Sequence, residues 1–108
     1  MKYIITLLIL INSLNANTAS WYGKECEGQY MANMQKFDPW RYTCASWHYP
    51  FNTKLKVTNI ANGKHIVVTV TDRGPAKRLN RAIDLSMIAF KQIADLETGL
   101  IQVRIEKL

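Results

Sequence analysis

Polar and apolar residues alternate most clearly in the middle of the chain. Over residues 54–58 every second residue is apolar, so a strand here would bury Leu55 and Val57 and leave the lysines in solvent. The dipeptide Asn62-Gly63 readily adopts the positive φ angles of a tight turn. Residues 65–71 follow as a β-branched run of the kind found in strands. The pattern predicts a β-hairpin.

The flanking segments carry shorter patterns. Residues 18–22 are typical of an opening strand, residues 23–39 of a loop, and residues 101–106 alternate again as a closing strand. Ser86 can cap a helix that runs from Met87 to about Asp95. Strands dominate, with one or two short helices between them. A small closed β-barrel satisfies such a pattern and leaves few open sheet edges.

The N-terminal residues, 1–16, are predicted to be a signal peptide that precedes one domain of residues 17–108. Lys2 stands before a short apolar run, residues 4–11, and small and polar residues follow it. The run is shorter than the about 20 apolar residues that span a bilayer; an N-terminal core helix is the alternative. No cysteine stands immediately after the predicted cleavage site to carry a lipid, since the first cysteine is Cys26, so we expect a periplasmic or secreted protein without a stable membrane anchor.

Two cysteines and a basic charge balance add to this picture. Export favours a disulfide between Cys26 and Cys44, worth roughly 3 kcal/mol for a loop of this size, and two free buried thiols are the alternative. The formal net charge is +6. Outside the cytoplasm, such a charge predicts attraction to cell-wall polymers or lipid head groups, and nucleic acid is not an expected partner.

Six short motifs occur in order along residues 17–108: Ala19-Ser20-Trp21-Tyr22-Gly23, Pro50-Phe51, Val57-Thr58-Asn59, Asn62-Gly63, Asp72-Arg73-Gly74-Pro75 and Ile83-Asp84-Leu85-Ser86. Each motif is weak alone. As an ordered set they resemble the barrel domain of the rare lipoprotein A family, and they cover nearly the whole predicted domain.

The resemblance implies a six-stranded double-psi β-barrel, the fold also found in expansins and in membrane-bound lytic transglycosylase A. Active members of the family are lytic transglycosylases, which cleave the bond between N-acetylmuramic acid and N-acetylglucosamine in peptidoglycan. The muramic 6-hydroxyl closes onto C1 and leaves a 1,6-anhydro end, so no water is consumed. One carboxyl group can protonate the leaving oxygen and then accept the hydroxyl proton.

Two aspartates are the candidate catalytic residues. Asp72 matches the aspartate of the family's Asp-Arg-Gly-Pro motif, which is implicated in catalysis; the alternative is a turn residue that bonds to backbone amides. Asp84 matches the acid of the Ile-Asp-Leu-Ser motif, and the corresponding aspartate is essential in the expansin barrel. It could instead fix the start of the following helix through the helix amides.

Five further residues are candidates for substrate binding. Ser20 and Tyr22 match positions that line the family's groove; Tyr22 could hydrogen-bond sugar hydroxyls, whereas Ser20 could merely satisfy a backbone group. Arg73 could hold a substrate carboxylate, lower the pKa of Asp72 or serve as a structural partner. Trp47 and His48 are candidates for the wall of the groove, although aromatic residues of small domains commonly belong to the core.

Two positions depart from the family pattern. Gln35 stands where active members carry a glutamate, and Ser46 stands where they carry a histidine. Neither side chain exchanges protons near neutral pH, so the resemblance supports the fold more strongly than the activity. In an extended segment His48 would face the same side as Ser46 and could replace the missing histidine.

The leading hypothesis is an endolytic peptidoglycan lytic transglycosylase with Asp72 as general acid and base. A non-catalytic, expansin-like module that binds wall glycans is the first alternative, and an inhibitor or protein-binding barrel is the second. Peptidoglycan glycan strands are the expected partner of a monomer that needs no cofactor. The two histidines lack an accompanying carboxylate or cysteine cluster, so no metal site is expected.

Overall fold

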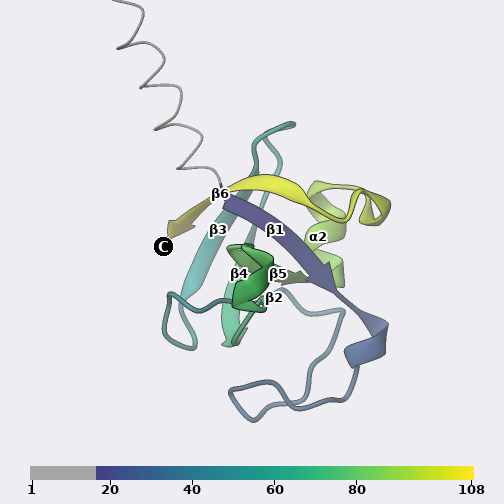
Figure 1. The fold of residues 1–108 in the computed structure, drawn as a ribbon, viewed down its shortest axis with the longest axis vertical. Helices are drawn as coiled ribbons and strands as arrows, with labels where there is room; N and C mark the ends of the chain where they lie inside the picture. Colours follow the sequence, from purple (N-terminus) through teal and green to yellow (C-terminus); the bar gives the residue numbers. More distant parts are fainter. Residues whose placement is uncertain (1–16) are drawn as a thin grey trace, which may run out of the picture.

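A computed structural model describes residues 17–108, and within them six strands close into a barrel in the order β1-β5-β2-β4-β3-β6 (Figure 1). The strands are β1 (Asn17–Tyr22), β2 (Thr43–Ala45), β3 (Lys54–Asn59), β4 (His65–Asp72), β5 (Ile83–Ser86) and β6 (Ile101–Lys107). The helix α2 (Met87–Ile93) follows β5, and the 3-10 helices are η1 (Lys24–Cys26), η2 (Lys77–Leu79) and η3 (Leu96–Thr98). The predicted fold class, a mainly β six-stranded barrel with a short helix, is confirmed.

The predicted hairpin is β3 and β4. The two strands pair antiparallel, and Gly63 adopts a positive φ of 75° in the turn between them. Leu55 and Val57 are fully buried, as the alternation predicts, because their side chains point into the barrel. β6 pairs with both β3 and β1 and closes the barrel.

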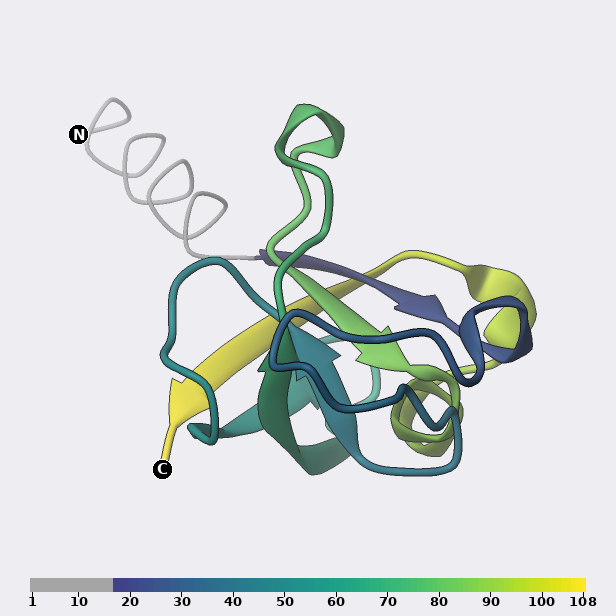
Figure 2. The same ribbon diagram turned by 90° about the horizontal axis from the view of Figure 1, so that it is seen from below.

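Two parallel strand pairs give the barrel its topology. β1 pairs in parallel with β5, and β2 pairs in parallel with β4. Parallel partners cannot be joined by a tight turn, so each pair is separated by other elements along the chain. Two long connections also join strands that are not neighbours in the barrel: residues 23–42 run outside the barrel from β1 to β2, and residues 73–82 run from β4 to β5 (Figure 2).

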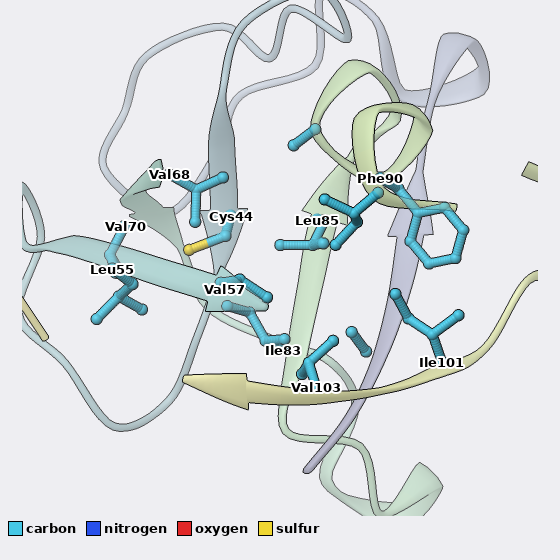
Figure 3. Packing of buried hydrophobic residues seen from close by; sticks show 13 residues of the cluster. Cys44, Leu55, Val57, Val68, Val70, Ile83, Leu85, Phe90, Ile101 and Val103 are labelled. Carbon is cyan, nitrogen blue, oxygen red and sulfur yellow. The ribbon is translucent and has the colours of Figure 1, made fainter. Parts of the chain in front are cut away.

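The core fills the barrel and continues beneath α2 (Figure 3). The helix buries Met87, Ala89, Phe90 and Ile93, so its apolar face covers one end of the barrel. The capping role predicted for Ser86 is wrong. Its side chain makes no capping bond, because its hydroxyl donates instead to the Arg41 carbonyl at 2.6 Å.

The predicted disulfide is absent from the structure, in which Cys26 and Cys44 are both free thiols. Cys44 belongs to the buried core, where Figure 3 shows its sulfur directed inward beside Val68 and Val70. Cys26 lies in η1, outside the strands. Burial, with a contribution from the Asp84 charge, raises the pKa of Cys44 to about 12, so this thiol stays protonated.

The predicted signal peptide, residues 1–16, lies outside the described residues. Among residues 17–108, no helix is both long and apolar enough to cross a membrane.

Candidate functional site

Four neighbouring strands place a row of residues side by side. Asp72 on β4 pairs with Ala45 on β2, Ala45 pairs with Asp84 on β5, and Asp84 pairs with Ser20 on β1. Adjacent strands lie about 4.8 Å apart, so the Cα atoms of the two aspartates are separated by about 10 Å. The structure therefore brings together Asp72, Asp84 and Ser20, which are far apart in the sequence.

A β-bulge directs Asp72 toward this row. Val70 points into the core, so regular alternation would turn Thr71 outward and Asp72 back inward. The register between β2 and β4 shifts at Cys44 and Ala45, and Ala45 consequently pairs with Asp72. A bulge of this kind re-aims one side chain. Asp72 thereby lies beside Ala45 on the outer face of the barrel.

One oxygen of Asp72 is held by the backbone. Oδ1 accepts hydrogen bonds from the amides of Arg73 at 2.8 Å and Ala32 at 2.9 Å. The hydrogen bonds found within residues 17–108 leave Oδ2 without a partner. Asp72 thus bonds to a turn amide, as the structural alternative predicts, and also keeps one oxygen available to a ligand.

Asp84 is bonded to Ser20, whose hydroxyl donates to Oδ1 at 2.7 Å. Ser20 therefore binds a carboxyl group rather than a backbone group. Burial raises the pKa of Asp84 and the Asp72 charge adds to this, while the Ser20 hydrogen bond and the Arg81 charge lower it. The net effect is a raised pKa, and such a carboxyl group holds its proton to a higher pH than an exposed aspartate does.

Tyr22 lies on the same outer face as Ser20, two residues further along β1. Its ring stacks on Phe37, with the ring centroids 4.3 Å apart. Its hydroxyl is buried and has no hydrogen-bond partner within residues 17–108. Burial raises the pKa of Tyr22, and the charges of Asp72 and Asp84 raise it further. The hydroxyl therefore stays protonated and is an unused donor near the two carboxyl groups.

The segment of residues 23–42 covers part of this face. Besides the Ala32 amide and the Phe37 ring, it contributes Met31, whose sulfur accepts a hydrogen bond from Thr71 at 3.2 Å. Sequence reasoning missed all three residues. A backbone amide has no residue-type signature, so nothing in the sequence could have identified Ala32. The aromatic residue at position 37 was the one signal available within the loop.

Arg73 supports the neighbouring loop. Its guanidinium donates to the carbonyls of Ser46 at 2.9 Å and Tyr49 at 2.8 Å, and it lies 4.0 Å from the ring centroid of Phe51. These contacts favour the structural role among the alternatives left open by the sequence. A contact between Arg73 and substrate stays a prediction.

Trp47 and His48 lie just after β2, at the end of the barrel where β1 and β5 begin. Trp47 is 44% exposed, and its Nε1 donates to the Pro75 carbonyl at 2.6 Å. His48 lines a pocket of about 210 Å³ together with Asn17, Ser46, Tyr49, Ala82 and Ile105. Among residues 17–108 no hydrogen bond joins His48 to Asp72, so its role as a substitute histidine stays a prediction.

The arrangement combines a carboxyl group with a raised pKa, a second carboxyl group with an available oxygen, and an unused phenol donor. Such a set of groups can donate and accept protons, and it can form hydrogen bonds with a ligand that carries several hydroxyl groups. In the described part of the chain, no group of three or more His, Cys, Asp or Glu side chains could hold a metal ion.

Comparisons with known proteins show which family and which folds this chain is similar to. The sequence matches the family described as lytic transglycolase over residues 15–105. It is 43% identical over 89 residues to the endolytic peptidoglycan transglycosylase RlpA of Pseudomonas aeruginosa. That alignment covers 82% of this chain and 26% of the relative, so the chain spans about a quarter of the relative's length.

The fold is similar to those of two solved structures. One is a mutant expansin of Clavibacter michiganensis in complex with cellohexaose, with a TM-score of 0.66 and 20% identity, covering 87% of this chain and 50% of that one. The other is the Streptomyces papain inhibitor, with a TM-score of 0.65 and 24% identity, covering 83% and 91%. At these identities the likeness shows the shared barrel fold.

Proposed function

This chain belongs to the lytic transglycolase family, and on that premise we propose that it is an endolytic peptidoglycan lytic transglycosylase that acts in the periplasm or outside the cell. It cleaves the bond between N-acetylmuramic acid and N-acetylglucosamine and leaves 1,6-anhydromuramic ends. Asp72 is the general acid and base, and Asp84 is the second carboxyl group of the site.

The placement of Asp72 carries this proposal. The bulge opposite Ala45 puts Asp72 on the face that also holds Asp84 and Ser20. Bulges are common next to active sites because they re-aim side chains. The amides of Ala32 and Arg73 fix Oδ1, so Oδ2 has a defined direction in which to meet a substrate.

Asp72 can perform both proton transfers. It donates a proton to the glycosidic oxygen as the bond from that oxygen to C1 breaks, and N-acetylglucosamine leaves with a free hydroxyl. The Asp72 carboxylate then takes the proton of the muramic 6-hydroxyl while the bond from O6 to C1 forms. Asp72 regains its proton and no water is consumed.

Two neighbouring side chains support the carboxyl pair. The Tyr22 hydroxyl is a protonated donor without a protein partner, so it is suited to a sugar oxygen. Ser20 keeps Asp84 oriented through its 2.7 Å hydrogen bond. Because its pKa is raised, Asp84 stays protonated to a higher pH than an exposed aspartate does, and the protonated form does not repel an anionic substrate.

The test is product analysis after incubation of the purified exported protein with peptidoglycan sacculi. Mass spectrometry is expected to find anhydro-muropeptides with the wild type and none with Asp72→Asn. Glu106→Gln, an exposed change on β6, is the matched control and should cut normally. Both variants should still unfold cooperatively, and the urea midpoint of Asp72→Asn should fall only slightly, because its side-chain oxygen can still accept from the Ala32 and Arg73 amides. Anhydro products that persist in Asp72→Asn would remove Asp72 from the mechanism.

A binding module without catalysis is the second candidate. The observation in its favour is that neither Gln35 nor Ser46 supplies a titratable group at the two places that depart from the family pattern. The Gln35 side chain accepts a hydrogen bond from Asn33, and Ser46 is buried with its hydroxyl bonded to the His48 amide. Co-sedimentation with sacculi in the absence of any anhydro product would favour this candidate.

A further inference from the structure

The connection between β4 and β5 extends away from the barrel (Figure 2). Its outer part, residues 76–81, contains η2 and is here called the basic arm. The arm carries Lys77, Arg78 and Arg81 and has no acidic residue. Lys77 and Arg78 are exposed, as is Leu79 between them and Arg81.

Both ends of the basic arm are attached to the barrel. The Pro75 carbonyl accepts the hydrogen bond from the Trp47 indole, and the Ala82 amide donates to the Thr18 carbonyl at 2.9 Å. Within the arm, the amide of Asn80 donates to the Lys77 carbonyl at 3.1 Å. The arm is therefore a hydrogen-bonded structure that starts beside Trp47 and returns to β5.

The cations of the arm are not neutralised by the protein. No ion pair found within residues 17–108 involves Lys77, Arg78 or Arg81. The Lys77 ammonium lies 4.9 Å from the ring centroid of Trp47, close to the base of the arm. Arg81 lies three residues before Asp84, and its charge opposes the burial that raises the pKa of Asp84. The base of the arm therefore lies near the site at two points, beside Trp47 through Lys77 and near Asp84 through Arg81.

Ionised aspartates repel an anionic substrate, and nearby cations offset that repulsion. Peptidoglycan strands are anionic because their stem peptides end in carboxylates, and strands without peptides expose the lactyl carboxylate of N-acetylmuramic acid. Arginine binds a carboxylate through two parallel hydrogen bonds, and lysine adds an adaptable point charge. The composition of the arm is suited to this kind of anion.

We propose that Lys77, Arg78 and Arg81 form a carboxylate-binding subsite beside the candidate catalytic residues. The inference rests on the proposed function, because the strand held at Asp72 is the molecule that presents the carboxylate. The subsite selects substrate by charge, whereas the aspartates act on the glycosidic bond.

The test measures binding of labelled, soluble strands to the full exported protein by fluorescence anisotropy, within a time too short for cleavage. Four strand preparations are compared: peptide-bearing and peptide-stripped strands, each with its carboxyl groups free or converted to amides. The arm variant is Lys77→Gln with Arg78→Gln. The control is Lys64→Gln with Lys91→Gln, which removes the same charge from exposed positions in the hairpin turn and on α2.

We expect the arm variant to bind carboxylate-bearing strands about fivefold more weakly than the wild type, as for the loss of two exposed ion pairs. It should bind amidated strands as the wild type does, and the control should match the wild type on all preparations. A loss confined to peptide-bearing strands identifies the stem peptide as the source of the carboxylate. A loss confined to stripped strands identifies the lactyl group.

Three results would overturn the subsite. They are a loss in the arm variant no larger than in the control, equal wild-type affinity for the amidated and untreated forms of both kinds of strand, and a loss seen only with anionic phospholipid vesicles. The last would assign the arm, with its exposed Leu79, to a membrane surface. Failure of the proposed function is distinguishable, because a wild type that binds in the expected pattern and makes no anhydro product refutes cleavage and leaves the subsite intact.

Discussion

The hydrogen bond between Ser20 and Asp84 allows the electrostatics of the site to be tested through stability. Ser20→Ala removes a donor that lies 2.7 Å from the carboxyl group, at a position that is 5% exposed. The acceptor is partly buried, and the bond is charge-assisted wherever Asp84 is ionised. We expect Ser20→Ala to lower the free energy of unfolding by about 1.5–3 kcal/mol at pH 7.

The pH dependence of this loss has a definite sign. Burial raises the pKa of Asp84 above its ordinary value of 3.8, and the Ser20 bond lowers that raised pKa. A group whose folded pKa is raised stabilises the fold below its unfolded pKa and loses this contribution as pH rises through the folded pKa. Without Ser20 the folded pKa rises further. The penalty is therefore largest at neutral pH and falls to about 0.5–1.5 kcal/mol below pH 3.8, where the bond is neutral.

Urea denaturation followed by circular dichroism at pH 7 and pH 3 measures both values. Asp84→Asn is the matched background, because its side-chain oxygen can still accept from Ser20 while the charge is gone. In that background Ser20→Ala should cost the smaller amount at both pH values. Two results would refute the reasoning. One is an equal loss at pH 7 and pH 3 in the wild-type background, and the other is an equally large loss at pH 7 in the Asp84→Asn background.

Three further changes have expected outcomes. Asp84→Asn alone should raise the urea midpoint at pH 7 and leave it unchanged at pH 3, since it removes a charge with a raised pKa; a lower midpoint at pH 7 would contradict this. Tyr22→Phe should raise the free energy of unfolding by about 1 kcal/mol, because it removes a buried hydroxyl without a partner, and destabilisation would show that the hydroxyl is satisfied. Arg73→Lys should lower the free energy of unfolding by about 2 kcal/mol in the same urea assay, because an ammonium group cannot replace a planar guanidinium that bonds to two carbonyls. An unchanged urea midpoint would show that Arg73 does not support its loop.

Elements with a long, regular pattern could be predicted from the sequence. The hairpin follows from the alternation that buries Leu55 and Val57, and the closing strand follows from residues 101–106 in the same way. β2 could not be predicted, because three residues contain too little alternation to distinguish a strand from a loop. Its neighbours β4 and β5 are remote in the sequence, and only tertiary pairing makes these residues a strand.

The residues of the candidate site could be predicted from the sequence, but their arrangement in space could not. The family motifs point to Asp72 and Asp84, whereas the bulge that puts them on one face depends on register, which no motif records. The disulfide between Cys26 and Cys44 was inferred from export and cysteine count. Neither says where a Cβ points, and the Cys44 side chain points into the core.

Cleavage in heavy-oxygen water tests the central claim most directly. Sacculi are incubated with the purified protein in this solvent, and the new glycan ends are analysed by mass spectrometry. The account predicts 1,6-anhydro ends that carry no heavy oxygen and that disappear in Asp72→Asn, because the muramic 6-hydroxyl attacks C1 and Asp72 moves its proton. Reducing ends that carry heavy oxygen, or anhydro ends that persist in Asp72→Asn, would contradict it.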